Sequence, residues 1–433
     1  MKYKEPKTMD TKGIGYLKEK LKRKYSRVKE RYNYYEMKHR VRDFGISSPP
    51  ELRYWMGTLG WCAKAVDSLA DRLVFREFGN DVWDMNGIFA QNNKAILTDS
   101  ACLSSLISAC SFIYITTDEQ GQPLMKVIDG RHATGEIDPV TNMLKEGYAV
   151  LEYDERDNPI TEAYLTPGQV EVYEYGKKQR TIGNDAPYPL LVPIINRPDA
   201  VRPFGHSRIS RACMSIQAGA VRTAKRSEIS AEFFSFPQKY ALGVEKGAIA
   251  SLDPWVAAMS SMFMVSKDSD GDTPKVGEFA QQSMAPHTEQ LRMFAGLFAG
   301  ETGLTLDDLG FPSQNPSSAE AIKSSHESLR LTARKAQRDF GNGFLNAGYL
   351  AACLRDKQTY DRALLAGVKC KWEPIFEPDY ATLSNIGDGL LKINQAVPDY
   401  FTKETLRDIT GIESTEQEDL LSPEALDEEL AGE

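Results

Sequence analysis

The sequence "LGFPSQNPSSAEAIKSS", residues 309–325, joins a loop rich in Pro, Ser and Asn to a long segment with helical spacing. Ser317 and Glu320 fit the S-x-x-E capping box, in which the hydroxyl accepts a backbone N–H and the Glu reaches back to the cap. Pro316 keeps the residue before it extended. The pattern therefore predicts an abrupt loop that ends at a well-capped helix.

The segment after this cap has the apolar spacing of one helix face. After a first interval of seven, apolar residues recur every three or four positions, as on an amphipathic helix. These residues are Ile322, Leu329, Ala333, Ala336, Phe340, Phe344, Ala347, Ala351 and Leu354. Gly341, Gly343 and Gly348 lie inside the segment, so we expect a long helix over 319–356 with a kink near its middle.

The composition is that of a globular protein. The chain has 433 residues, of which 41% are apolar and 26% charged, enough for two or three units with their own cores. It lacks the long apolar runs of membrane spans and the apolar core of a secretory signal, so neither is expected. The six cysteines show no C-x-x-C pairing, which favours reduced and mostly buried thiols.

The charge is unevenly distributed along the chain. Residues 1–53 carry 16 Lys and Arg against 7 Asp and Glu, a net charge of +9. Residues 399–433 carry 2 against 12, a net charge of −10, and the whole chain has −9. Tight binding of nucleic acid over the entire surface would need many net phosphate contacts, which this balance disfavours. The basic, tyrosine-rich segment 15–42 fits either a nucleic-acid surface or, as we favour, an amphipathic helix with a solvated basic face.

The sequence pattern changes along the chain from helical spacing to the alternation of strands. Helical patterns over 15–42, 55–73 and 84–109 give way to short alternating strands with turn signals from residue 111 to residue 183. This order predicts an α+β unit.

A further helix is predicted from about residue 206 to residue 234, with an apolar face and a basic face. On a helical wheel the basic positions lie within an arc of about 100°. They are Arg208, Arg211, Arg222, Lys225 and Arg226. This basic stripe fits either a surface helix with solvated cations or a site for DNA or a neighbouring subunit.

Catalytic and metal-binding motifs are missing. The chain contains no dinucleotide fingerprint, no P-loop and no nucleophile elbow. The acidic turn at 268–274 fails the EF-hand pattern, since Gly271 stands fourth and Phe279 twelfth. Five scattered histidines form no zinc-type cluster. We therefore expect no enzyme and no catalytic, cofactor-binding or metal-binding residues.

Five motifs, in this order, resemble the portal proteins of tailed double-stranded DNA bacteriophages. They cover about residues 30–360 and read "YYEMKH" at 34–39, "NRPDAVRPFGHSRIS" at 196–210, "EFAQQSMAPH" at 278–287, "ETGLTLDDLG" at 301–310 and "NPSSAEAI" at 315–322. The resemblance implies a portal fold: an α/β wing, a helical stem, a small α/β clip, a tunnel loop, a long kinked helix and a short C-terminal segment.

The resemblance also implies boundaries for these parts. They are an N-terminal helical segment and wing over 1–205, a first stem helix over 206–235, a clip over 236–284, a second stem helix over 286–302, a tunnel loop over 303–318, a kinked helix and wing return over 319–398, and a short acidic crown or tail over 399–433. The implied tunnel-loop residues are Leu306, Asp307, Asp308, Phe311, Gln314 and Asn315. A large helical crown is in doubt, because little sequence remains after Ala396.

The function implied by the resemblance is a ring at one capsid vertex, generally of twelve copies, through which DNA is packaged and ejected. The implied partners are other copies of the chain, double-stranded DNA without sequence specificity, the terminase large subunit, the major capsid and scaffolding proteins, and head-tail connector proteins. The implied location is the virion, after assembly in the host cytoplasm. The alternatives are another head-tail connector or structural protein of a phage, or a nucleic-acid-processing enzyme.

Overall fold

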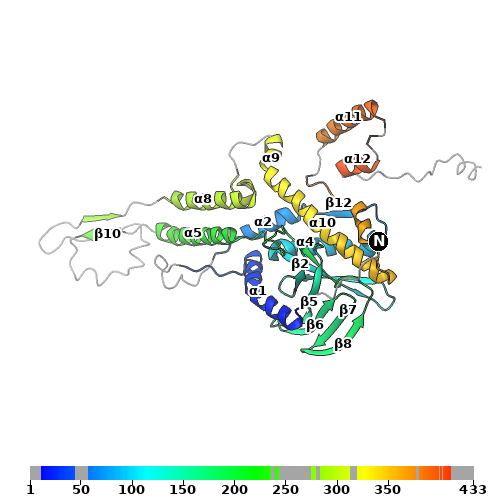
Figure 1. Cartoon of the computed structure of the whole chain (residues 1–433). Coiled ribbons are helices and arrows are strands. Elements are labelled where there is room, and N and C mark those ends of the chain that lie inside the picture. Colours follow the sequence, from blue (N-terminus) through cyan, green and yellow to red (C-terminus); the bar gives the residue numbers. More distant parts are fainter. Residues whose placement is uncertain are drawn as a thin grey trace, which may run out of the picture. The chain divides into compact units, whose positions relative to one another are not determined.

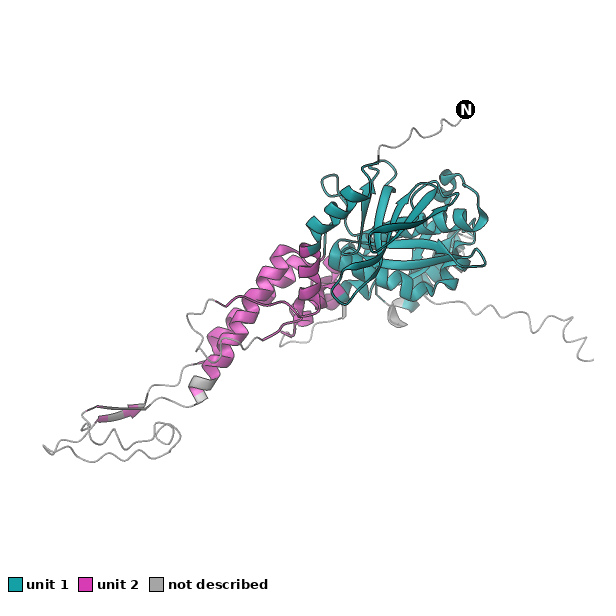
Figure 2. Cartoon of the chain, turned by 90° about the horizontal axis from the view of Figure 1, so that it is seen from below, with its two compact units in different colours: residues 1–25, 67–207, 330–433 teal, residues 26–66, 208–329 magenta. Residues whose placement is uncertain are grey.

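The computed structural model describes residues 11–43, 57–235, 239–242, 275–278, 283–312, 319–376, 380–398, 400–401 and 403–410. The chain divides into two compact units (Figure 2). The first unit comprises residues 1–25, 67–207 and 330–433, and the second comprises residues 26–66 and 208–329. Both helices and sheets are present, which confirms the predicted α+β class.

Two antiparallel sheets form the centre of the first unit. The three-stranded sheet has the order β3-β2-β9, with β2 at Cys110–Thr117, β3 at Pro123–Asp129 and β9 at Leu191–Ile195. The five-stranded sheet is a meander of β4 (Ala133–Ile137), β5 (Leu144–Tyr153), β6 (Pro159–Thr166), β7 (Gln169–Glu174) and β8 (Lys177–Gly183). The strands predicted between residues 111 and 183 are thus confirmed.

The helix predicted over 84–109 is two helices, α3 (Met85–Gln91) and α4 (Lys94–Ser108). Asn93 separates them because its backbone is left-handed, with φ 52°, a conformation that no helix continues through. α4 packs on the three-stranded sheet. The Ser105 hydroxyl lies 2.8 Å from the Ser111 hydroxyl and donates to the Ile194 carbonyl at 2.8 Å, so the buried polar groups at this contact are satisfied.

The long helical segment is assigned to both units, with residues 319–329 in the second and residues 330–356 in the first. α9 (Ala319–Ser325) and α10 (Glu327–Asp356) are interrupted at His326, and α10 continues unbroken through all three glycines. The interruption therefore lies near the start of the segment and not at the glycines, where we expected a kink. The Phe344 ring contacts the rings of Phe75 and Trp372, which belong to a ribbon of β1 (Phe75–Gly79) and β12 (Lys369–Trp372).

The helix α1 (Ile14–Tyr35) is amphipathic, and its first half belongs to the first unit. Leu17 and Leu21 form a buried cluster with Tyr148 and Val150 of β5. The buried Glu146 carboxylate accepts the backbone N–H groups of residues 12 and 13 at 2.9 and 3.1 Å, which stabilises the positive end of the helix. The basic segment is therefore a helix docked on the sheet, as we favoured.

Several lysines on this half of α1 pair with acidic residues of the five-stranded sheet. Lys18 lies 2.7 Å from Glu162, whose side chain is 2% exposed, and Lys20 lies 2.5 Å from Glu136. A buried carboxylate is costly without a partner. The basic character of α1 is thus partly explained by the acidic surface beneath it.

The second unit contains a pair of helices, α5 (Arg211–Ser235) and α8 (Ala285–Thr302), which lie side by side (Figure 1). A short antiparallel ribbon of β10 (Lys239–Leu242) and β11 (Lys275–Glu278) is described between them in sequence. The 3-10 helix η2 (Asp307–Leu309) follows α8.

The C-terminal part of the first unit contains the 3-10 helix η3 (Arg362–Gly367), α11 (Tyr380–Ala396) and α12 (Lys403–Thr410). Asp408 of α12 forms an ion pair with Arg76 of β1. Residues 411–433, most of the predicted acidic crown or tail, lie outside the described residues.

Candidate channel segments

The helix pair of the second unit corresponds to the two predicted stem helices. The helices approach closely at Gly219, where a Cβ atom would lie 2.8 Å from the Phe294 ring. Thr223 donates to Gln290 at 3.1 Å across the same contact. Phe298 of α8 is fully buried, with its ring 5.7 Å from that of Trp61. Gly219 of α5 thus lets the Phe294 ring of α8 approach closely, and Phe298 joins α8 to α2 (Trp61–Ala70).

The first of these helices starts later than predicted. α5 begins at Arg211, and the Ser210 hydroxyl accepts the Cys213 N–H at 3.1 Å as an N-cap. Arg208 therefore lies before the helix and not on its basic face. Its guanidinium donates to the carbonyls of Ala65, at 3.3 Å, and Thr302. Arg208 ties three segments of the second unit together.

The other members of the predicted basic stripe have different environments. Lys225 is buried, and its ammonium lies 2.9 Å from the Asp43 carboxylate. Arg222 and Arg226 are half-buried and have polar partners of their own. Arg211 is exposed at the first position of α5. The structure thus does not bring the five residues together into one exposed basic surface, since Arg208 and Lys225 make internal contacts.

A buried node in the second unit joins the end of α1 to α2 (Trp61–Ala70) and α5. Gln217 of α5 is fully buried. Its side-chain amide donates to the Leu59 carbonyl and its oxygen accepts the Cys62 N–H, both at 2.7 Å. His39 lies beside it and stacks on Tyr34 at 4.0 Å. Burial lowers the pKa of His39, which favours the neutral ring.

Tyr34 and His39 of the "YYEMKH" motif thus pack beside the buried Gln217, which is a structural role for the motif. Sequence reasoning did not identify Gln217, because a single Gln on an apolar helix face carries no motif. The available signal was its position among Cys213, Ile216 and Ala220 on that face. A polar residue at a core position calls for a buried hydrogen-bond partner.

Most of the "NRPDAVRPFGHSRIS" motif, residues 196–207, belongs to the first unit and forms a closed loop. Asn196 and His206 exchange hydrogen bonds at its neck, at 2.7 and 2.8 Å. Gly205 has φ +70°, and a Cβ there would lie 2.1 Å from the Asn196 carbonyl oxygen, so only glycine fits. Asp199 accepts the His206 ring N–H at 2.6 Å, and this bond lowers the pKa of Asp199. Asn196, Gly205 and His206 thus close the loop from within, whereas Ser207 fastens it to α4 by donating to the Ile107 carbonyl at 2.6 Å.

The predicted tunnel loop is described only at its beginning. Gly303 ends α8 in the left-handed region. The Asp308 carboxylate accepts the N–H and the hydroxyl of Thr305, both at 2.9 Å, and lies 3.3 Å from His326. Burial would raise the pKa of Asp308, but these partners outweigh burial and lower it. Asp308 thus fastens the base of the loop.

The remaining tunnel-loop predictions divide into two groups. Asp307 is exposed, whereas Leu306 and Phe311 are half-buried beside η2. Gln314, Asn315 and the cap residue Ser317 lie outside the described residues, as does the side chain of Glu320. α9 nevertheless starts at Ala319, two residues after the predicted cap position.

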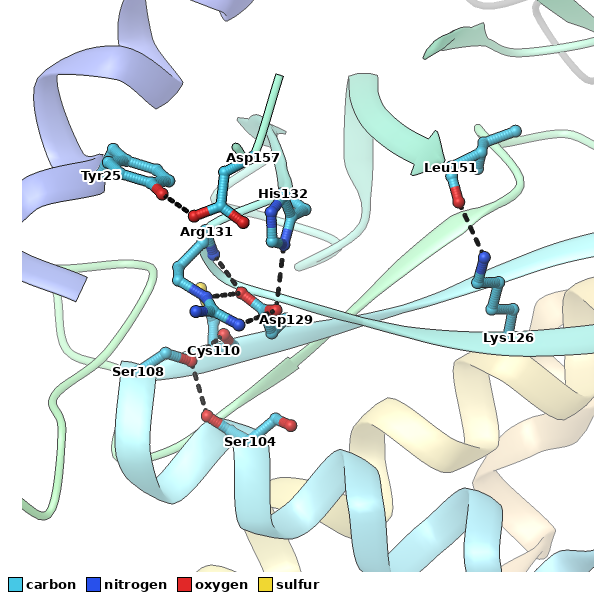
Figure 3. A network of polar contacts seen from close by, with 10 residues as sticks. All are labelled: Tyr25, Ser104, Ser108, Cys110, Lys126, Asp129, Arg131, His132, Leu151 and Asp157. Atoms are coloured by element: carbon cyan, nitrogen blue, oxygen red, sulfur yellow. Dashed lines mark hydrogen bonds and ion pairs between the residues drawn. The ribbon is translucent and has the colours of Figure 1, made fainter. Parts of the chain in front are cut away.

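A polar network closes the turn after β3 in the first unit (Figure 3). Asp129 accepts from Arg131 at 2.6 and 3.1 Å and lies 3.0 Å from the His132 ring. Burial would raise the pKa of Asp129, but these partners lower it to about 2. Nearby, Tyr25 of α1 donates to Asp157 at 2.5 Å. The network fastens the turn and α1, and sequence reasoning did not identify it.

Three broader observations concern the described residues. Among them, no group of three or more His, Cys, Asp or Glu side chains is placed to hold a metal ion. No helix in this part of the chain is both long and apolar enough to cross a membrane. No disulfide joins the cysteines, four of which are buried, as expected for reduced thiols.

Two phage portal proteins are similar to this chain in sequence. No model of a known protein family matches the chain. The portal protein of Mycobacterium phage L5 is 24% identical over 344 residues, which are 74% of this chain and 69% of that protein. The portal protein of Mycobacterium phage D29 is 23% identical over 414 residues, 90% of this chain and 83% of that protein.

Among solved structures, the chain is similar to one from the neck of an empty gene transfer agent particle, solved with C6 symmetry. The TM-score is 0.47 at 12% identity, covering 86% of this chain and 96% of that chain. The sequence relatives support the resemblance to phage portal proteins, and over most of its length the chain is similar to the portal proteins of two mycobacteriophages.

Proposed function

We propose that this chain is a phage portal protein, copies of which form a ring at one vertex of the capsid. The channel of the ring passes double-stranded DNA during packaging and ejection. The observation that carries the proposal is sequence similarity to two portal proteins that extends over 74% and 90% of the chain. Similarity over this length extends well beyond one short shared motif.

The order of elements in the second unit supports this proposal. A closely packed helix pair, α5 and α8, is followed by a loop whose base is fastened by Asp308, and then by α9. This is the order of stem, tunnel loop and long helix that a portal needs. Rigid helices position a loop accurately, and a loop can reach a moving duplex without disturbing the core.

The charge distribution suits a channel that DNA slides through. Each tight phosphate contact would resist movement, so a portal should repel DNA evenly rather than bind it. The chain has a net charge of −9, which is multiplied around a ring. Arg208 and Lys225 act as internal ties of the second unit, whereas the exposed Arg211 remains available for DNA or a neighbouring subunit.

The finer points of the proposal follow the family resemblance. The ring has twelve copies, the terminase large subunit and head-tail connector proteins dock on it, and the major capsid and scaffolding proteins surround it. Assembly takes place in the host cytoplasm, and the mature location is the virion. The protein itself carries out no catalytic step.

A reconstituted packaging reaction tests the function. Capsid, scaffolding and terminase proteins are produced with and without this chain, and DNA inside the particles is measured as its resistance to nuclease. We expect protected DNA only when the chain is present. Equal protection without the chain would contradict the proposal.

A further inference from the structure

One edge of the three-stranded sheet is open. In the part of the chain that the structure describes, β3 pairs with β2 and with no other strand. In an antiparallel pair, every second residue directs both its N–H and its C=O away from the partner strand. An open edge of this kind can accept an additional strand.

The side chain of Asn92 identifies which backbone groups of β3 point outward. Its oxygen accepts the Met125 N–H at 2.7 Å, and its amide donates to the Pro123 carbonyl at 2.9 Å. Asn92 thus makes the two hydrogen bonds that a neighbouring strand would make. By the alternation of the strand, the carbonyl of Met125 and both backbone groups of Val127 point the same way. No described strand pairs with these groups.

A groove of about 460 Å³ runs along this edge, between β3 and α4. On the helix side it is lined by Ile96, Ser100 and Ser104, which recur every four residues on one face of α4. On the strand side it is lined by Met125 and Val127, among others. Ile96 is 73% exposed, so its side chain is accessible to an occupant of the groove.

The charges of the groove are already engaged within the chain. Lys126 donates to the Leu151 carbonyl at 2.8 Å, and Asp129 is held by Arg131 and His132 (Figure 3). The groove therefore presents apolar and hydroxyl-bearing walls and open backbone groups. An uncharged occupant is complementary to such walls, because a charge would lose hydration there without gaining a partner.

The other sheet shows how an open edge is normally protected. β8, at the edge of the five-stranded sheet, is exposed along its whole length and carries Lys177, Lys178 and Arg180. Such charges discourage pairing with another strand. In the described ranges, Asn92 alone hydrogen-bonds to the outward backbone groups of β3, and it covers one end of the edge.

We propose that the groove between α4 and β3 is a docking site for an extended, uncharged segment of a partner protein, which adds to the sheet as a strand next to β3. The segment forms backbone hydrogen bonds with Met125 and Val127 and places alternate apolar side chains against Ile96. From Met125 to Asp129 the edge accommodates about four residues of such a strand. Strand addition of this kind draws affinity from the main chain and specificity from alternate side chains. The site does not depend on ring formation, so it goes beyond the function proposed above.

A peptide selection tests this inference on the full chain. Random heptapeptides displayed on cells are selected for binding to the wild-type chain and then against S100R, which fills the groove. The control is A95R, which places the same side chain at an exposed position of α4 that does not line the groove. If S100R unfolds, I96K replaces it, since that position is mostly exposed.

We expect the selected peptides to share alternating apolar residues without charges, to bind A95R normally and to lose binding to S100R. As synthetic peptides they should slow hydrogen exchange at the Val127 amide, and methylation of their alternate amide nitrogens should weaken binding by about tenfold or more. The proposal is overturned if no peptide distinguishes the wild type from the groove variant. It is also overturned if the peptides bind without protecting Val127.

Discussion

Replacing Gly343 with alanine should destabilise the first unit, although the same change stabilises an ordinary helix. A Cβ atom at this position would lie 2.6 Å from Cδ1 of Ile194 and 3.4 Å from the Pro193 carbonyl oxygen. Ile194 is fully buried and has little room to move. The alanine gains about 0.5–1 kcal/mol of helix stability and loses about 1–3 kcal/mol by overpacking, so a net loss of up to about 2.5 kcal/mol is expected.

A second substitution makes this prediction sharper. I194V removes the Cδ1 atom that the new methyl group would meet, and alone it should cost about 0.5–1.5 kcal/mol. In G343A the same change should be neutral or stabilising, which corresponds to a coupling energy of about 1–2 kcal/mol between the two positions. The four proteins are compared by urea unfolding of the full chain at one fixed protein concentration.

G296A in α8 provides the matched control. A Cβ atom there meets nothing within 4 Å, so the variant should be more stable by about 0.5–1 kcal/mol. If G343A were stabilised as much as G296A, or if I194V failed to rescue it, the explanation of Gly343 by close packing would be refuted.

Three further predictions concern the second unit. K225M should lower the free energy of unfolding by about 2–4 kcal/mol, because it leaves the partly buried Asp43 without its ion pair to Lys225. R211M, at an exposed position, should change the free energy of unfolding by less than about 0.5 kcal/mol. Equal effects of the two variants in thermal unfolding would argue against this distinction. Because the pKa of His39 is lowered in the folded protein, its contribution to stability is complete above about pH 6.5 and is lost as the pH falls below that value. H39Q should flatten this dependence in urea midpoints, and an unchanged profile would exclude His39 as its source. Deletion of residues 312–315 should leave rings intact, since loop length costs little, but lower the amount of packaged DNA; normal packaging would remove the loop from the mechanism.

The sequence predicted those features that depend on local periodicity. Alternating residues with turn signals gave the strands from β2 to β8, and the spacing of Leu17 and Leu21 gave α1 as an amphipathic helix. The start of α5 was misplaced although its signal was present. Ser210 is an N-cap residue, and the helix begins after it. The apolar spacing continues to Ile209, before this cap, and therefore suggested an earlier start.

Features that depend on distant segments could not be predicted. A helical wheel places Lys225 on a basic arc, but the wheel contains no information on Asp43, which lies far earlier in the chain and neutralises it. The glycines of α10 gave an expectation of a kink because their neighbours in space, Ile194 and Cys370 among them, were unknown. Glycine in a helix permits either bending or close contact, and only the tertiary structure distinguishes the two.

Copies of this chain are proposed to close into a ring around a channel for DNA. Electron microscopy of the purified full-length protein tests this proposal most directly. We expect closed rings of about twelve copies, with a central hole wide enough for duplex DNA and with the segment 303–318 facing that hole. A protein that stays monomeric at every concentration, or rings in which this segment lies on the outer surface, would contradict it.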